Sequence, residues 1–196
     1  MRPSHRRHWR VVALTLLLAF AAQAGAANRE VLDLDGRSVD PLQQPAAKAA
    51  VLVFQRTDCP ISNRYAPEIE RLDRKFSARG ISFWLIYPDG KQAVAAIRQH
   101  LKDYRYHVAA LRDPGHVLVR RAKVQVTPEV AVFVAERGEM QLIYHGRIDD
   151  RYVAFGKERP APTTHDLEQV LTNVADGRIM KPMSTPSVGC YISDLQ

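Results

Sequence analysis

The two cysteines are the residues of this 196-residue chain that are best suited to chemistry. Cys59 follows an apolar run at residues 50–54 and precedes a segment with helical spacing that starts at Ile61. A thiol at the start of a helix meets unpaired backbone N–H groups and the positive end of the helix dipole, and both favour the thiolate. Because the thiolate is the reactive form, this position predicts a nucleophilic sulfur at Cys59.

The neighbours of Cys59 act on its pKa in opposite directions. Pro60 suits the first position of a helix, where its missing N–H is no loss. Asp58 is a negative charge that opposes thiolate formation, whereas Arg56 favours the thiolate if its side chain turns toward the sulfur. We therefore predict a modestly acidic thiol. The alternative is an inert free cysteine that is simply buried.

Three roles are open to the second cysteine, Cys190. It could attack an oxidised Cys59 as a resolving thiol, form a permanent bridge that pins the C-terminal tail, or pair with a second molecule. A permanent bridge would close a long loop and stabilise the fold by roughly 4 to 5 kcal/mol in the chain-entropy model. The tail is long enough for either intramolecular role.

The elements that must position these sulfurs follow from hydrophobic periodicity and from turn residues. We expect strands at residues 50–55, 81–87, 107–111, 130–135 and 141–144, and helices at residues 61–78, 92–104, 116–123 and 165–175. Gly138 allows a hairpin turn between the last two strands. Strands that alternate with helices and end in a hairpin predict an α/β fold, with a central mixed sheet that is flanked by helices and has an antiparallel edge.

Two acidic residues, Asp149 and Asp150, follow the last expected strand and lie between Arg147 and Arg151. We interpret them as a solvated strand exit rather than a metal site, because cation sites built from oxygen need more ligands. His145 alternates with apolar neighbours and is expected to be a half-exposed strand residue.

The first 27 residues have the pattern of a bacterial secretory signal peptide. Arginines precede an apolar run at residues 11–22, and small residues then offer a cleavage site. We predict three parts: a signal peptide at residues 1–27, one domain at residues 28–176, and a tail at residues 177–196. The alternative is an uncleaved anchor, for which the apolar run is short. A periplasmic or secreted location would permit disulfides.

The charge of the chain argues against a nucleic-acid partner. It contains 28 Lys and Arg against 21 Asp and Glu, a net charge of +7. The first 27 residues hold four arginines and no acidic residue, so the mature chain would carry +3. A charge this small, spread along the chain, does not make a basic binding surface. No later segment is apolar enough to span a membrane, so we expect no membrane partner after signal cleavage.

Three motifs, in order along the chain, resemble the thioredoxin-like superfamily. Strand, cysteine and helix come first, with the CxxC of thioredoxins reduced to Cys59-Pro60-Ile61-Ser62. Ala66-Pro67 stands where thioredoxins carry a helix-kinking proline, and Thr127-Pro128 precedes a strand where they carry a cis-proline. The additional strand and helix before the cis-proline resemble the redoxin branch of bacteria, which includes peroxiredoxins and periplasmic thiol-disulfide oxidoreductases.

The resemblance implies a set of site residues. The catalytic residues would be Cys59, Cys190, Thr57 and Arg56, and the substrate groove would be lined by Thr127, Pro128, Pro60 and Ser62. A cis-proline would leave the backbone of Thr127 free to pair with an extended substrate at the sulfur. Two departures matter: Ser62 replaces the second cysteine of the CxxC, and Thr57 lies two residues before Cys59 where peroxiredoxins have threonine three before. No cofactor is implied.

The resemblance therefore predicts an exported thiol-disulfide oxidoreductase that acts on protein thiols or disulfides, with Cys59 as nucleophile and Cys190 as its partner. One alternative is an antioxidant thiol peroxidase that acts on a small peroxide. A second is a non-catalytic module with a structural Cys59–Cys190 disulfide. In a third, Met180, Met183 and Cys190 supply soft copper ligands, although copper chaperones of this fold use two cysteines on the loop and a histidine.

Overall fold

The structure is a computed structural model that describes residues 30–43 and 47–193. The expected signal peptide at residues 1–27 lies outside this part of the chain. In chain order the elements are β1 (Leu32–Asp33), β2 (Ala49–Phe54), α2 (Pro60–Arg64), α3 (Ala66–Phe76), the 3-10 helix η1 (Ser77–Arg79), β3 (Ile81–Tyr87), α4 (Val94–Asp103), β4 (Ala109–Arg112), α5 (Val117–Ala122), β5 (Val126–Thr127), β6 (Glu129–Glu136), β7 (Glu139–Gly146), β8 (Tyr152–Ala154), β9 (Lys157–Glu158), α6 (Asp166–Ala175), β10 (Met183–Ser184) and β11 (Cys190–Tyr191). Within the described ranges, no helix has the length and apolar character needed to cross a membrane.

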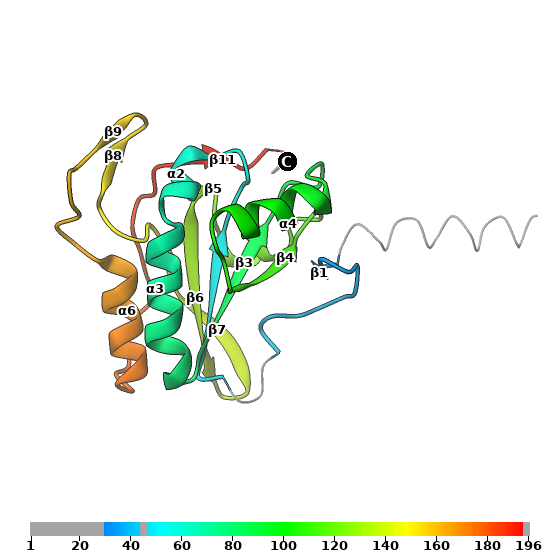
Figure 1. Cartoon of the computed structure of the whole chain (residues 1–196). Helices are drawn as coiled ribbons and strands as arrows, with labels where there is room; N and C mark the ends of the chain where they lie inside the picture. The colour runs from blue at the N-terminus through cyan, green and yellow to red at the C-terminus, as the bar shows by residue number, and fades with distance from the viewer. Residues whose placement is uncertain (1–29, 44–46, 194–196) are drawn as a thin grey trace, which may run out of the picture.

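A seven-stranded mixed sheet forms the centre of the fold, in the order β1-β4-β3-β2-β6-β7-β10 (Figure 1). β2, β3 and β4 are parallel to one another, whereas β6 is antiparallel to both β2 and β7. The tight turn between β6 and β7 contains Gly138, whose φ is +86°. This topology confirms the α/β fold and the closing antiparallel hairpin that the sequence predicts.

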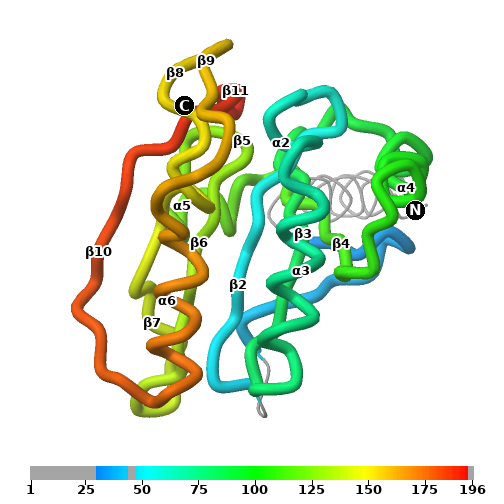
Figure 2. Tube along the Cα trace, turned by 60° about the vertical axis from the view of Figure 1, so that its left-hand side comes forward, coloured from blue at the N-terminus to red at the C-terminus, as the bar shows by residue number. Residues whose placement is uncertain are grey.

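Hydrophobic clusters pack against both faces of β2, the strand that leads to Cys59. Val51 and Val53 belong to the cluster that includes the buried faces of α3 and α6. Leu52 and Phe54 pack instead with residues of α5 and of the N-terminal segment. Successive side chains of a strand point to opposite faces, so this continuous apolar run requires cover on both sides. The helices α3 and α6 lie side by side on one face (Figures 1 and 2).

The single helix expected at residues 61–78 is instead two helices, α2 and α3, which meet at Tyr65. One continuous helix would need an N–H at Pro67 to bond to the carbonyl of Asn63, and proline has none. Pro67 is accommodated in the first turn of α3, where a missing N–H is tolerated. The proline thus separates the short helix at the sulfur from the longer helix that packs on the sheet.

The segment after β7 contains short strands that the sequence analysis did not predict. β8 and β9 form a hairpin, and the tail after α6 returns along the molecule, where β10 pairs with β7 and β11 pairs with β5 (Figure 2). Gly146 permits this return, because a Cβ there would lie 2.3 Å from the hydroxyl oxygen of Thr185. The described part of the tail is therefore packed onto the domain rather than extended from it.

Candidate active site

Cys59 lies where the chain leaves the central strand β2 and enters α2. It is the N-cap residue of α2, with an extended backbone, and Pro60 follows at the first helical position. Its N–H donates to the carbonyl of Arg56 at 3.4 Å, and its own carbonyl accepts from the N–H of Asn63 at 3.0 Å. The side chain is only 1% exposed. The strand–helix junction that the sequence predicts is present, and it buries the sulfur.

The Thr127–Pro128 peptide bond is cis, as the order of elements predicts. It brings the carbonyl of Thr127 next to the sulfur of Cys59, which donates a hydrogen bond to that oxygen at 3.1 Å. Residues 68 positions apart in the chain thus share one site. Within the described residues, β5 pairs along one edge with a segment of the tail.

Cys190 occupies that edge. β11 pairs antiparallel with β5 so that Cys190 lies opposite Thr127, and the two thiol sulfurs are 2.6 Å apart. Both cysteines are free thiols in this structure. The approach depends on Gly189, because a Cβ at this position would lie 2.3 Å from the carbonyl oxygen of Thr127. The structure therefore brings the sulfurs into contact through a backbone fit that only glycine allows.

The two thiols differ in acidity. Burial opposes the ionisation of Cys59, but hydrogen bonds from Cys190 and from Ser62 outweigh it and lower the pKa of Cys59. Burial, the hydrogen bond to Cys59 and the adjacent charge raise the pKa of Cys190 to about 12. The hydroxyl of Ser62 is buried and has no other partner within the described residues, which leaves its proton available to a thiolate. Of the two thiols, Cys59 is therefore the one that ionises first, and Cys190 keeps its proton.

The two polar neighbours expected from the peroxiredoxin comparison are directed elsewhere. The guanidinium of Arg56 forms two bonds to the carboxylate of Asp58, at 2.9 and 3.0 Å, and also reaches the carbonyl of Tyr191 at 3.5 Å. The hydroxyl of Thr57 accepts from the side chain of Gln92 at 3.1 Å. The inward turn by which Arg56 would favour the thiolate of Cys59 is thus not observed, and its charge offsets part of the rise in the pKa of Cys190.

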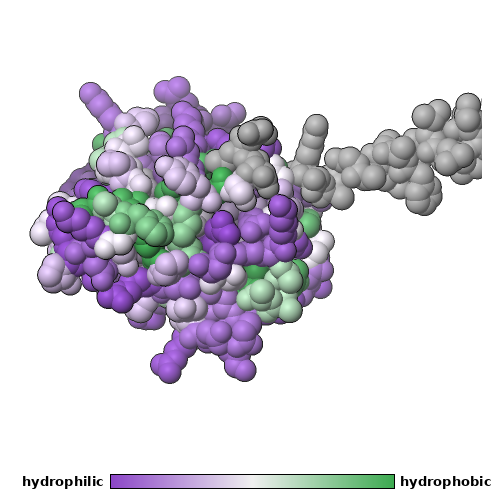
Figure 3. All heavy atoms as spheres, turned by 90° about the horizontal axis from the view of Figure 1, so that it is seen from above, coloured by the Kyte–Doolittle hydropathy of each residue, from purple (hydrophilic) through white to green (hydrophobic). Residues whose placement is uncertain are grey.

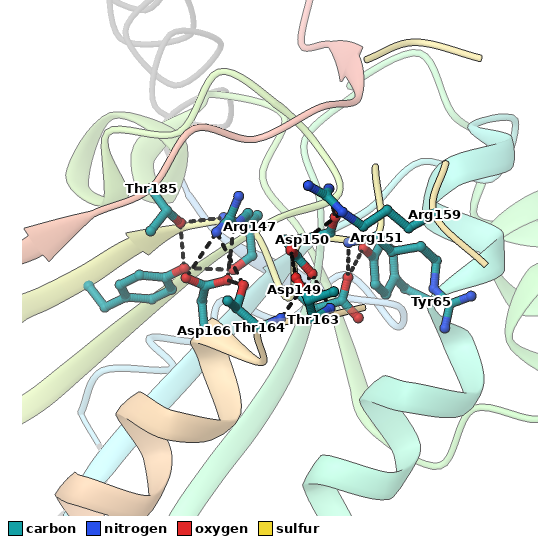
Figure 4. Close-up of polar contacts among 11 residues, drawn as sticks. Tyr65, Arg147, Asp149, Asp150, Arg151, Arg159, Thr163, Thr164, Asp166 and Thr185 are labelled. Atoms are coloured by element: carbon teal, nitrogen blue, oxygen red, sulfur yellow. Dashed lines mark hydrogen bonds and ion pairs between the residues drawn. The ribbon is translucent and has the colours of Figure 1, made fainter. Parts of the chain in front are cut away.

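The interpretation of Asp149 and Asp150 as solvated residues is wrong, since both are buried in the loop after β7. Figure 4 shows the polar contacts around them. One oxygen of Asp149 accepts from the hydroxyl of Tyr65 at 2.5 Å and from the N–H of Arg151 at 2.9 Å. Asp150 accepts from the hydroxyl and N–H of Thr163, among other donors. Burial of a carboxylate requires such donors, which local sequence does not reveal.

The contact between Asp149 and Tyr65 has a consequence for the sulfur. Tyr65 is the residue at which α2 ends and α3 begins. Burial and the hydrogen bond to Asp149 raise the pKa of Tyr65 above its usual range, so its hydroxyl remains a donor. The carboxylate therefore anchors the junction at which the short helix after Cys59 meets α3. We identify Tyr65 and Asp149 as positioning residues that the sequence analysis missed.

One group of potential metal ligands lies near this loop: atoms of Glu68, His165 and Glu168 come within 4.8 Å of one another. The two carboxylates already bind the guanidinium of Arg71, and Lys75 contacts Glu168 at 2.5 Å. These cationic side chains bond to the carboxylates that a metal ion would need as ligands, so the group is better described as an ion-pair network. His145, expected to be half-exposed, is partly buried and lies 3.3 Å from Glu129.

Comparison with known proteins agrees with this geometry. Residues 22–145, more than half of the chain, match the AhpC/TSA family. No curated protein matches the sequence at a significant level. Two solved structures have similar folds and cover 83% of this chain each. A hypothetical protein of Sinorhizobium meliloti 1021 is 20% identical over 88% of its own length, with a TM-score of 0.69. An uncharacterized conserved protein of Geobacillus kaustophilus is 21% identical over 86% of its length, with a TM-score of 0.68.

A third solved structure is the thioredoxin domain of a thiol-disulfide oxidoreductase from Bacteroides vulgatus. It is 12% identical, covers 74% of this chain and 91% of its own, and has a TM-score of 0.53. At these identities the likeness concerns the fold alone. The sulfur at the strand–helix junction, the cis-proline beside it and the family match lead to one conclusion: the chain belongs to the AhpC/TSA family of redoxins.

Proposed function

We propose that this protein is an exported thiol-disulfide oxidoreductase in which Cys59 is the nucleophile and Cys190 is the partner thiol. The observation that carries the proposal is the 2.6 Å separation of the two sulfurs, with the lowered pKa on Cys59. A thiolate next to a second thiol is the arrangement that disulfide exchange requires. The buried Ser62 supports the charge on Cys59 but cannot replace the second cysteine of a CxxC.

The reaction proceeds in two exchanges. The thiolate of Cys59 attacks one sulfur of a substrate disulfide, the substrate S–S bond breaks, and the other substrate sulfur leaves as a thiolate and takes up a proton. Cys190 then loses its proton and attacks the sulfur of Cys59 in the mixed disulfide. A Cys59–Cys190 bond forms, and the second substrate sulfur leaves as a thiolate. The substrate gains two electrons, and the protein becomes oxidised.

The edge of β5 supports a role in substrate binding. In the structure this edge pairs with an extended segment whose cysteine lies opposite Thr127, next to the cis-proline at Pro128. A substrate strand with its sulfur at the same position would reach Cys59 in the same way. Because β11 now fills the edge, such a substrate binds only after the tail has moved away.

Export rests on the sequence alone. The basic residues, the short apolar run and the small residues at the end of residues 1–27 support a cleaved signal peptide. A periplasmic or secreted location follows from that proposal, and protein thiols or disulfides are the substrate class. In such a location a disulfide between Cys59 and Cys190 would persist until a partner reduces it.

A thiol peroxidase is the second candidate, because the chain belongs to the AhpC/TSA family and Cys190 is placed to resolve a sulfenic acid on Cys59. The side chains of Arg56 and Thr57 argue against it. Arg56 bonds to Asp58 and Thr57 bonds to Gln92, so neither side chain is directed at the sulfur of Cys59. They therefore do not form a site that polarises an O–O bond.

Mass spectrometry of the protein under non-reducing conditions, followed by a dithiothreitol titration, tests the proposal. We expect an intramolecular Cys59–Cys190 disulfide that dithiothreitol reduces readily. A bridge with a reduction potential below about −300 mV would indicate a structural role instead. Disulfide reductase and peroxidase assays of Cys59→Ser provide the second test. Unchanged activity in both assays would show that Cys59 is not the nucleophile.

A further inference from the structure

A hollow of about 470 Å³ lies between the start of α3, the loop after β7 and the segment that leads into α6. Neither cysteine lines it. The rings of Tyr65, Pro67 and Pro162 belong to its wall. Its charged or titratable lining residues are Arg64, Glu68, Arg71, Asp149, Arg151 and His165. The hollow therefore combines apolar surface with charges of both signs.

Several of these charges are already paired with one another. The guanidinium of Arg71 forms ion pairs with Glu68 and with Glu168 of α6. Arg64 forms an ion pair with Glu158 of β9, with an N–O distance of 3.2 Å. Groups that neutralise each other have little capacity left for a ligand. The capacity of the hollow thus depends on the groups whose hydrogen bonds are not all made.

Asp149 is the negative group with an unused oxygen. Its residue is only 4% exposed, and its Oδ1 atom accepts from the hydroxyl of Tyr65 and from the N–H of Arg151. The Oδ2 atom accepts no hydrogen bond from the described residues, although Asp149 lines the hollow. A carboxylate oxygen that is so far removed from bulk water needs a donor. The contents of the hollow are the source that remains for that donor.

Arg151 is the positive group without a partner. It is partly buried and lies next to Tyr65 and Asp149 (Figure 4), yet its guanidinium forms no ion pair with a carboxylate of the described residues. Burial raises the pKa of Tyr152, and the charges of Arg64 and Arg151 partly offset this rise. Both guanidinium groups therefore lie near the same ring. A guanidinium presents a planar set of donors that matches a carboxylate.

We propose that this hollow binds a free α-amino acid with an apolar side chain. The ammonium group of the ligand donates to Oδ2 of Asp149, and its carboxylate accepts from the guanidinium of Arg151. The apolar side chain packs against the rings of Pro67 and Pro162. This binding does not depend on the proposed redox function, because neither cysteine lines the hollow.

The two signs of charge favour a zwitterion over a simple ion. A ligand with only a negative charge would be repelled by Asp149, and a ligand with only a positive charge would be repelled by Arg151. An α-amino acid carries both charges on one carbon atom and can therefore bond to both groups. A metal ion would meet the same repulsion from Arg151, with Arg64 and Arg71 also in the lining.

The apolar part of the lining selects the side chain of the ligand. Pro67 is exposed and Pro162 is partly buried, so both rings can meet a ligand that enters from solvent. Figure 3 views the molecule from the end where α2, β8 and β9 lie and shows a hydrophobic area bordered by hydrophilic surface. Burial of an aliphatic side chain between such rings adds to the affinity, whereas a polar side chain would lose its bonds to water.

Isothermal titration calorimetry of the full chain with three matched probes tests the chemistry. The probes are L-leucine, isoamylamine, which lacks the carboxylate of leucine, and 4-methylpentanoate, which lacks its ammonium group. We expect leucine to bind with a Kd below about 1 mM. Each analogue loses one charged hydrogen-bonding group and should bind at least about tenfold more weakly. An analogue that binds as tightly as leucine, or leucine that does not bind at about 10 mM, would overturn the proposal.

A pair of variants tests the location. Arg151→Gln removes the unpaired guanidinium, and Arg120→Gln is the matched control, because Arg120 is exposed on α5 and does not line the hollow. Arg151 is chosen over Asp149, whose carboxylate also holds Tyr65. We expect Arg151→Gln to weaken leucine binding about tenfold or more without weakening isoamylamine binding, and Arg120→Gln to change neither. Equal leucine affinities in the two folded variants would show that the ligand does not bind in this hollow.

Discussion

The cysteine pair and the acidic loop, which contains Asp149 and Asp150 (Figure 4), are two polar regions that differ in how completely their hydrogen bonds are made. Asp150 accepts from the N–H groups of Thr163 and Thr164 and from the hydroxyl of Thr163. In contrast, the buried hydroxyl of Ser62 has no partner among the described residues apart from the sulfur of Cys59. The carboxylate of Asp150 thus has several donors bonded to it, whereas the cysteine site has a hydroxyl donor that is free to bond to a thiolate.

This difference indicates which region reacts and which one supports. The donors around Asp150 hold its pKa below the usual range, so it stays charged and keeps the loop in place. At the sulfurs, the thiol of Cys190 donates to the sulfur of Cys59, so the negative charge that forms when Cys59 ionises meets a donor. A buried carboxylate with its hydrogen bonds made keeps its charge, whereas a site with an unused donor can stabilise the charge that a reaction creates.

The largest effect is expected from the loss of Cys190, because this residue takes part in the proposed reaction. Cys190→Ser removes the resolving sulfur, so we expect disulfide reductase turnover to fall roughly a thousandfold or more. One equivalent of mixed disulfide on Cys59 should accumulate, because the first exchange needs only that thiolate. Activity assays and mass spectrometry of the trapped protein check this. Multiple turnovers without Cys190 would mean that an external thiol resolves the intermediate.

A smaller effect is expected from a substitution that disturbs the contact between the tail and β5. Gly189→Ala adds a Cβ that would lie 2.3 Å from the carbonyl oxygen of Thr127, so the tail must shift and carry Cys190 away from Cys59. We expect the equilibrium constant for the internal disulfide, measured against dithiothreitol, to fall about tenfold as the effective concentration of the two thiols drops. Gly90→Ala is the control, because the Cβ that it adds would meet the side chain of Pro114 at 3.3 Å and not the backbone of Thr127. Equal constants in the two variants would contradict the role of Gly189.

The supporting region should respond in stability rather than in chemistry. Tyr65→Phe removes the hydroxyl that donates to the buried Asp149, and we expect the free energy of unfolding to fall by about 1 to 3 kcal/mol. Urea denaturation of the reduced protein measures this. Tyr104→Phe, at an exposed tyrosine, should change it little. A Tyr65→Phe protein as stable as the Tyr104→Phe control would show that this bond does not support the fold.

The smallest effect concerns pH. Because the pKa of Cys59 is lowered, its thiolate fraction should rise with pH with a midpoint below that of an ordinary cysteine. Cys190, with its pKa raised to about 12, stays protonated over this range. The alkylation rate of Cys59 against pH measures the midpoint. Cys190→Ala removes the donor and should move the midpoint upward, whereas Cys190→Ser keeps a hydroxyl donor and should move it less. Identical midpoints in the two variants would exclude this hydrogen bond as a cause.

Much of the fold was predictable because its signals are local. The apolar run of β2, the helical spacing after Cys59 and the glycine between β6 and β7 each specify an element from neighbouring residues alone. The break at Tyr65 was placed only approximately, since Pro67 indicates a kink but not its extent. The burial of Asp149 depends on a tyrosine 84 residues away, which no local pattern reveals.

By itself, the sequence determined that a thiol would stand between a buried strand and a helix, and that a proline would precede a later strand of the same sheet. Periodicity and proline chemistry act over a few residues and do not need the rest of the chain. Only the tertiary structure decided that the tail would pair with β5 and set Cys190 against Cys59, with Gly189 at the point of closest approach. A flexible segment can reach many positions at similar entropic cost, so its place is chosen by the backbone edge and the packing that it finds.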